Sequence, residues 1–133
     1  MALTITAADV AAVEVFEQWT GPAAEVITAG QMVRLDTTTG KATLSNGTTA
    51  AEARCRGIAL TGATAAGISM TVVKRGVIDL GDALGDLNYD QAVYLDNTDG
   101  ALGTAAGTVS LVVGRVVPVW GYPTADKALH VDL

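Results

Sequence analysis

Residues 31–40, QMVRLDTTTG, and residues 91–100, QAVYLDNTDG, share the pattern Q-x-V-x-L-D-x-T-x-G. In both copies Val and Leu stand two residues apart, which places them on the same side of a β-strand. The Asp that follows can accept backbone N–H groups of a turn, and the Gly closes that turn with a positive φ angle. The repeat therefore predicts two related β-hairpin units, and two copies are too few for a solenoid.

Strand-like segments separated by turn-forming residues extend outward from the repeat. A second strand led by glycine follows each copy, at residues 57–60 (GIAL) and 114–117 (GRVV). The candidate strands are residues 32–36, 41–44, 56–60, 69–75, 77–80, 92–96, 109–120 and 128–131. Only residues 48–53 look helical in this part of the chain. We expect an all-β fold, namely a small β-barrel or sandwich with hairpin repeats, an extended N-terminal arm and at most one or two short helices.

The composition fits one domain with thin β layers. The chain has 133 residues, and Ala, Thr and Gly supply 23, 17 and 15 of them. Charged residues make up 17%, too few for a disordered chain, and aromatic residues make up 5%, too few for a thick core. We therefore expect a β domain at residues 25–133 whose core partner subunits help to complete.

Residues 1–24 form a lead segment, separated from the rest by Thr20, Gly21 and Pro22. Residues 6–9 resemble a weak helix cap, whereas residues 13–17 alternate like a strand, so both alternatives stay open. The segment is either an arm that docks elsewhere or the first strand of the domain. Its larger apolar residues are the candidate anchors on a partner: Val10, Val13, Phe16 and Trp19.

Several classes of protein are excluded by what the sequence lacks. A single Cys excludes an intrachain disulfide framework, and a single His excludes a multi-His metal site. No apolar run reaches the length of a membrane span, and the N-terminus has no pattern of a secretory signal. The net charge of −6 and the absence of clustered Lys and Arg argue against nucleic-acid and membrane partners.

The sequence contains only weak matches to catalytic and metal-binding motifs. Asp79, Asp82, Asp86 and Asp90 are spaced unlike a calcium loop, which favours a polar turn over a metal site. Cys55 lies between two arginines that could lower its pKa, but no His-based partner accompanies it, so a small structural side chain is favoured. No phosphate-binding loop is present. We expect no catalytic residues, no metal, no cofactor and no enzymatic activity.

Trp120 and Tyr122 flank Gly121 near the C-terminus. Aromatic residues of these types are enriched at subunit interfaces, which makes both residues candidates for a contact between copies of the chain. A position in the barrel core and a sugar-binding site remain alternatives for them. The last alternative corresponds to a second function, a carbohydrate- or surface-binding β module displayed on a virion.

The sequence resembles the capsid decoration, or cement, proteins of tailed bacteriophages. The resemblance covers most of the chain and is carried by ITAGQMV at residues 27–33, DTTTGKA at 36–42, RGIAL at 56–60, VVKRGVI at 72–78, VYL at 93–95 and VGRV at 113–116. These motifs contain no catalytic residues.

The resemblance implies a small β-barrel-like domain on the outer surface of the assembled capsid, within the virion. It implies the major capsid protein and sister subunits as partners, often in a homotrimer. It also implies an N-terminal segment that reaches along the shell or to a neighbouring subunit. We therefore expect a structural protein that stabilises the phage head.

Overall fold

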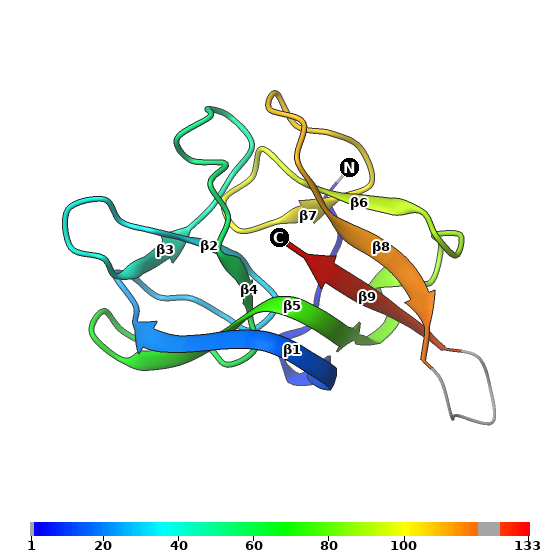
Figure 1. The fold of residues 1–133 in the computed structure, drawn as a ribbon, viewed down its shortest axis with the longest axis horizontal. Helices are drawn as coiled ribbons and strands as arrows, with labels where there is room; N and C mark the ends of the chain where they lie inside the picture. The colour runs from blue at the N-terminus through cyan, green and yellow to red at the C-terminus, as the bar shows by residue number, and fades with distance from the viewer. Residues whose placement is uncertain (1, 120–125) are drawn as a thin grey trace.

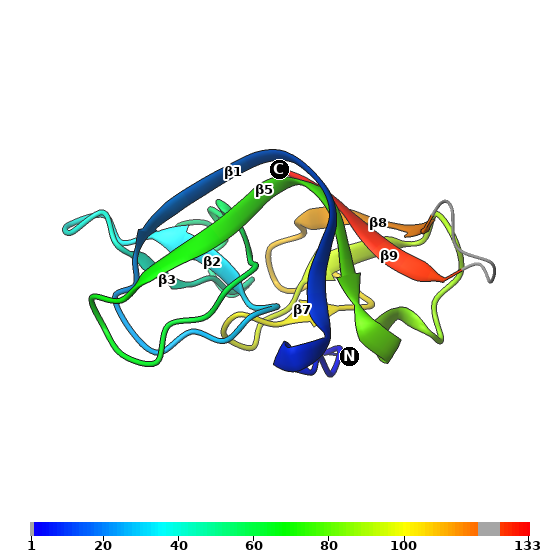
Figure 2. The same cartoon turned by 90° about the horizontal axis from the view of Figure 1, so that it is seen from below.

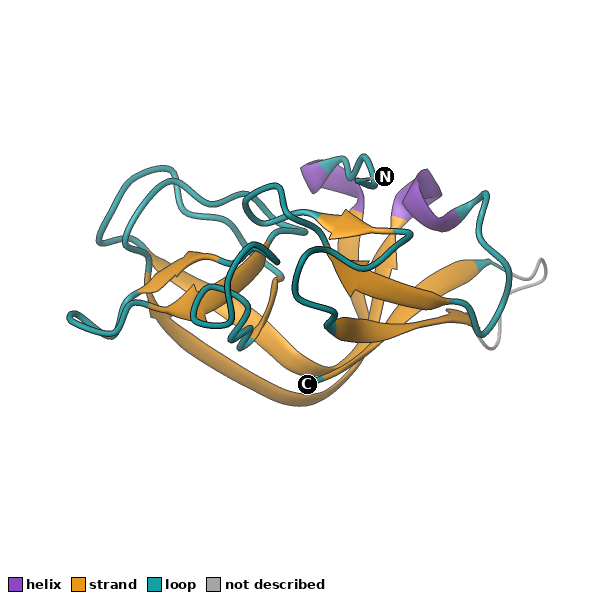
Figure 3. Cartoon of the chain, turned by 90° about the horizontal axis from the view of Figure 1, so that it is seen from above, coloured by secondary structure: helices purple, strands orange, loops and turns teal. Residues whose placement is uncertain are grey.

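The computed structural model describes residues 2–119 and 126–133, and it is built almost wholly of β-strands (Figures 1 and 3). The expected all-β class is confirmed. The elements in chain order are η1 (Ala7–Asp9), β1 (Val10–Pro22), β2 (Met32–Leu35), β3 (Ala42–Leu44), β4 (Gly57–Ala59), β5 (Ser69–Leu80), η2 (Gly81–Leu84), β6 (Ala92–Leu95), β7 (Leu102–Gly103), β8 (Val112–Pro118) and β9 (Lys127–Asp132).

One curled antiparallel sheet contains all of these strands. Its order is β3-β2-β4-β5-β9-β8-β6-β7, and β1 pairs with β5 from the opposite side. The first half of β5 pairs with β4, and its second half pairs with β9. In Figure 2 the β1–β5 ribbon arches across the whole molecule. β5 is therefore the strand that joins the two ends of the fold.

The two copies of the sequence repeat occupy equivalent places in this sheet. β2 lies between β3 and β4, and β6 lies between β7 and β8. The register is also the same, because Val33 is paired with Gly57 and Val93 with Gly114. The prediction of two related hairpin units is confirmed. The first unit consists of β2, β3, β4 and the first half of β5, and the second consists of β6, β7, β8 and β9.

The Gln shared by both copies of the repeat closes a turn in front of each hairpin. The side-chain oxygen Oε1 of Gln31 accepts a hydrogen bond from the backbone N–H of Thr28 at 2.9 Å. In the second unit, Oε1 of Gln91 accepts one from the backbone N–H of Asn88 at 2.9 Å. The repeat in structure thus begins three residues before the repeat in sequence.

The Asp and Gly of the repeat shape the hairpin tips. Asp36 Oδ1 accepts hydrogen bonds from the backbone N–H groups of Thr38 and Thr39, both at 2.9 Å. Asp96 accepts one from Thr98 at 2.9 Å. The closing glycines, Gly40 and Gly100, have φ angles of +71° and +73°, a region that L side chains avoid.

Two hydrophobic clusters lie on opposite faces of the first unit, because neighbouring residues of a strand point to opposite sides. The larger cluster takes Met32 and Ile58 from that unit and continues through the second unit. The smaller one takes Val33 and Ala59. Its buried members are Ala23, Ile27, Val33, Ala42, Ala59, Ala63, Met70 and Val72. Both faces of the first unit are therefore buried, and one of them shares its core with the second unit.

Three details differ from the sequence-based expectation. Residues 69–80 form one strand rather than two, since Gly76 marks a close approach of backbones: a Cβ there would collide with the carbonyl oxygen of Glu14. Residues 48–53 form a bend and turns, in which the side-chain oxygens of Asn46 and Thr49 accept the backbone N–H groups of Thr48 and Glu52 and so compete with helical hydrogen bonds. A two-residue strand, β7, completes the second hairpin.

The lead segment takes the strand alternative from Val10 onward. β1 runs the length of β5, with register shifts that skip Val13 and Phe16. Ahead of it, η1 lies beside η2 (Figure 3). The two are so close that a Cβ at Gly81 would touch the side chain of Asp9. The N–H of Leu3 donates to the carbonyl oxygen of Leu102 at 2.7 Å, so the start of the chain is attached to β7.

Candidate functional site

Three large apolar residues of β1 are exposed. Val13, Val15 and Phe16 are 41%, 38% and 56% exposed, which is unusual for neighbouring large apolar residues on one strand. The ring of Phe16 meets that of His130 on β9 edge to face, with centroids 6.3 Å apart. β1 pairs only with β5 among the described strands, so its other edge is open. We call Val13, Val15 and Phe16 the β1 patch.

The other two candidate anchors are largely engaged within the fold. Val10 is half-buried and packs against the larger hydrophobic cluster. Trp19 is half-buried against the smaller cluster, and its indole N–H donates to the backbone oxygen of Arg56 at 3.1 Å. Of the four anchor candidates, Val13 and Phe16 are the two with a substantial free surface. Trp120 and Tyr122 lie outside the described residues.

The run of aspartates forms an ordered, exposed segment, residues 79–90, which we call the acidic segment. Leu84 and Leu87 anchor it in the core. Lys127 Nζ donates to the backbone oxygens of Gly85 at 3.0 Å and Leu87 at 2.5 Å. Among the described residues no three His, Cys, Asp or Glu side chains gather closely enough to hold a metal ion. The segment is thus a fixed turn that presents negative charge.

Cys55 is set up as a structural residue. Burial raises the pKa of its thiol to about 11, although its hydrogen bond with the hydroxyl of Ser45 acts in the opposite direction. The Sγ and Oγ atoms are 3.1 Å apart. The two flanking arginines therefore do not activate the thiol, and it is poorly suited to act as a nucleophile.

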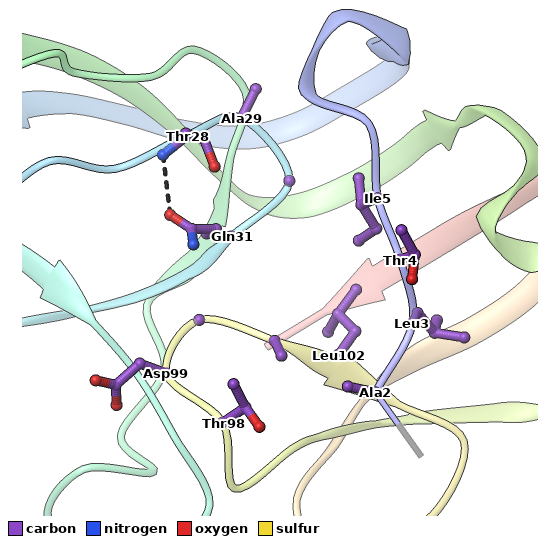
Figure 4. A pocket seen from close by; sticks show the side chains of 13 residues that line it. Ala2, Leu3, Thr4, Ile5, Thr28, Ala29, Gln31, Thr98, Asp99 and Leu102 are labelled. Atoms are coloured by element: carbon purple, nitrogen blue, oxygen red, sulfur yellow. Dashed lines mark hydrogen bonds between the residues drawn. The ribbon is translucent and has the colours of Figure 1, made fainter.

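A pocket of about 360 Å³ lies between the N-terminal residues 2–5, the turn at Thr28–Gln31 and the second hairpin tip (Figure 4). Small side chains and backbone form most of its wall. The amide oxygen of Gln31 is held by the N–H of Thr28, and the carboxylate of Asp99 accepts a hydrogen bond from the side-chain amide of Asn46 at 2.6 Å. No nucleophile and base meet in this pocket.

Two adjoining hollows form a continuous groove beside β2 and β4. They measure about 360 and 420 Å³ and share Leu35 and Arg56. Arg54 lines the first hollow, and Trp19 and Lys74 line the second. We call these five residues the basic groove.

The carboxylates in the basic groove are already engaged. Glu17 pairs with Lys74 at 3.4 Å. Asp36 accepts the backbone N–H groups of Thr39 and Thr38, which lower its pKa from the ordinary value of 3.8. Arg54 and Arg56 are exposed, and neither forms an ion pair with any carboxylate in the described part of the chain. Asp36 keeps its negative charge, so the charged lining consists of Arg54, Arg56 and Lys74 against Glu17 and Asp36, and the groove carries a small excess of positive charge.

The acidic segment was predicted from sequence as a polar turn, whereas the basic groove was not predicted. Residues 1–76 carry six Lys or Arg and six Asp or Glu, whereas residues 77–133 carry two against eight. The whole net charge of −6 thus belongs to the second part of the chain. This uneven distribution of charge can be read from the sequence. The groove cannot, because residues from separate strands form it.

Comparison of the chain with models of protein families, with curated proteins and with solved structures finds no match. In the described residues there is no helix with the length and apolar character needed to cross a membrane.

Proposed function

We propose that this protein is a structural, non-enzymatic decoration protein that binds the outside of a phage head as a homotrimer. In this role it adds contacts across the joints between subunits of the major capsid protein. Because it binds only the assembled shell, its binding energy adds to the stability of that shell.

The β1 patch is the observation that carries this proposal. Val13, Val15 and Phe16 stand on a strand that is anchored along its whole length to β5, so the patch is presented on a rigid support. Anchors that are already ordered lose little conformational entropy on binding. The open edge of β1 also offers backbone N–H and C=O groups to an extended segment of a shell subunit.

The chemistry of the described residues agrees with a binding role. The thiol of the half-buried Cys55 is protonated at neutral pH, and the ring of His130 meets that of Phe16 edge to face. The sequence motifs behind the resemblance fall on β2 and the turn before it, on the turn between β2 and β3, and on β4, β5, β6 and β8. The carbohydrate-binding alternative depends on Trp120 and Tyr122, and no described residue favours it.

The proposal is tested with heads assembled without this protein. Val13→Ser combined with Phe16→Ser removes apolar contact area from exposed positions, so the variant still folds. We expect its affinity for heads to fall at least about tenfold, since truncating an anchor residue at the centre of an interface costs about 2 kcal/mol or more. Binding is measured by co-sedimentation, and electron microscopy of decorated heads locates the added density.

A matched control uses two equally exposed apolar residues elsewhere. Val26 and Ile68 are 59% and 42% exposed, and neither belongs to β1. Val26→Ser combined with Ile68→Ser is expected to leave head binding unchanged. An equal loss of head affinity in both double variants would show that the β1 patch is not part of the interface. Failure of the wild-type protein to bind heads would refute the decoration role itself.

A further inference from the structure

The two charged surfaces of this molecule lie at opposite ends of it. The basic groove belongs to the first unit, with β2 and β4, and the acidic segment joins β5 to β6 in the second unit. Figure 1 places β2, β3 and β4 on the left and β6, β8 and β9 on the right. One copy of the chain therefore cannot bring its own groove and segment together, but two copies can.

We infer that the basic groove of one copy binds the acidic segment of a second copy, head to tail. The inference rests on the proposed function, because a protein that decorates a shell joint as an oligomer needs a surface between its copies. It adds to that function the two surfaces involved and the residues that join them.

The charges of the two surfaces are complementary. Arg54 and Arg56 project from the groove, where no described carboxylate pairs with them. Asp82, Asp86 and Asp90 are exposed on the segment, and none of them takes part in an ion pair of the described residues. Opposite charges placed across an interface speed association, fix its orientation and disfavour other partners.

Apolar groups accompany the charges on both sides. Leu35, 36% exposed, lies in the groove together with the half-buried ring of Trp19. Tyr89, 45% exposed, lies in the acidic segment, with Lys127 Nζ 5.4 Å from the centre of its ring. An aromatic residue that enters an apolar hollow surrounded by charge is typical of the energetic centre of a protein interface.

Both surfaces are ordered before they meet. The groove is held by the pairing of β2 with β4 and by the hydrogen bond from Trp19 to Arg56. The segment is held by Lys127 and by the buried Leu84. A contact of this kind joins different surfaces of the two copies, so repeating it closes a ring when the rotation between copies allows closure.

Charge reversal tests the contact on the full-length chain, with sedimentation velocity and native mass spectrometry as measurements. We expect wild-type protein in 0.1 M salt to form a closed oligomer that dissociates in 1 M salt, where the screening length falls from about 10 Å to about 3 Å. Arg54→Glu with Arg56→Glu, and separately Asp82→Arg with Asp86→Arg, are each expected to weaken association roughly 100-fold through like-charge repulsion.

Mixing the two double variants distinguishes this contact from other modes of assembly. In an equimolar mixture, the intact groove of one variant can bind the intact segment of the other, so association is expected to return. A chain that carries all four substitutions is expected to associate with itself again. Glu14→Arg with Asp132→Arg changes the net charge in the same direction and by the same amount as the aspartate variant, at exposed positions outside both surfaces. It removes the exposed ion pair between Asp132 and Arg75, which contributes little to stability, and is expected to leave association unchanged.

The result that would overturn the inference is a wild-type protein that stays monomeric, or a mixture that does not recover. Unchanged association in the groove variant together with lost binding to heads would also overturn it, because the groove would then face the shell. The decoration role is judged separately, by the binding of wild-type protein to heads.

Discussion

At the scale of single residues, Asp36 connects the hairpin repeat to the stability of the protein in acid. Its carboxylate accepts backbone N–H groups of Thr39 and Thr38, and these bonds hold its pKa below the ordinary value of 3.8. A carboxyl group with a depressed pKa in the folded state stabilises the fold when it is ionised. That contribution is complete above pH 3.8 and is lost as the pH falls through the lower pKa of the folded state.

Asp36→Asn tests this linkage. The amide oxygen can still accept the two N–H bonds, but it carries no charge and does not titrate. We expect the variant to be less stable than wild type at pH 7 and the difference to shrink below about pH 4. The measurement is the free energy of unfolding in urea from pH 2 to pH 7. A difference independent of pH would contradict the assignment, and Asp86→Asn serves as the control, because Asp86 is exposed and takes part in no ion pair of the described residues.

At the scale of elements, the second unit depends on a close approach of β8 to β9. Gly114 is paired with Val131, and a Cβ on Gly114 would collide with the carbonyl oxygen of His130. Gly57 has the same relation to Val73 in the first unit. The glycine paired with the valine of each repeat, Gly57 with Val33 and Gly114 with Val93, is therefore required by the packing of backbones.

Gly114→Ala is expected to lower the free energy of unfolding by about 1–3 kcal/mol, the usual cost of forcing extra volume into a packed site. Gly85→Ala is the control, because its backbone is in the right-handed helical region and the nearest atom to a Cβ is 3.2 Å away. Both variants are compared by thermal and urea unfolding. Equal stability of Gly114→Ala and wild type would show that the strands separate at little cost.

Much of the strand arrangement could be predicted from the sequence, because turn residues and the repeat mark where the chain reverses. The continuity of β5 could not, since Gly76 looks like a break when the opposite strand is unknown. The β1 patch was predicted only in part. Its register shifts at Val13 and Phe16 interrupt the two-residue alternation, so the pattern does not tell which of the apolar residues face outward.

At the scale of the whole molecule, β5 makes the two units depend on each other. Its residues Val72 and Val73 contribute to the first unit, and Ile78 and Leu80 contribute to the core of the second. β1 pairs with both halves of β5. Neither unit can lose its part of β5 without disturbing the strand that the other unit needs.

We therefore expect the two units to unfold in one cooperative step, as single domains of this size commonly do. The first unit is followed by the fluorescence of Trp19 in a Trp120→Phe variant, which leaves one tryptophan in the chain. The complete sheet is followed by far-ultraviolet circular dichroism. The two urea transitions are expected to have the same midpoint and the same slope. If the signal of Trp19 changed at a lower urea concentration than the circular dichroism, the first unit would be shown to melt by itself, and β5 would then connect the units without coupling them.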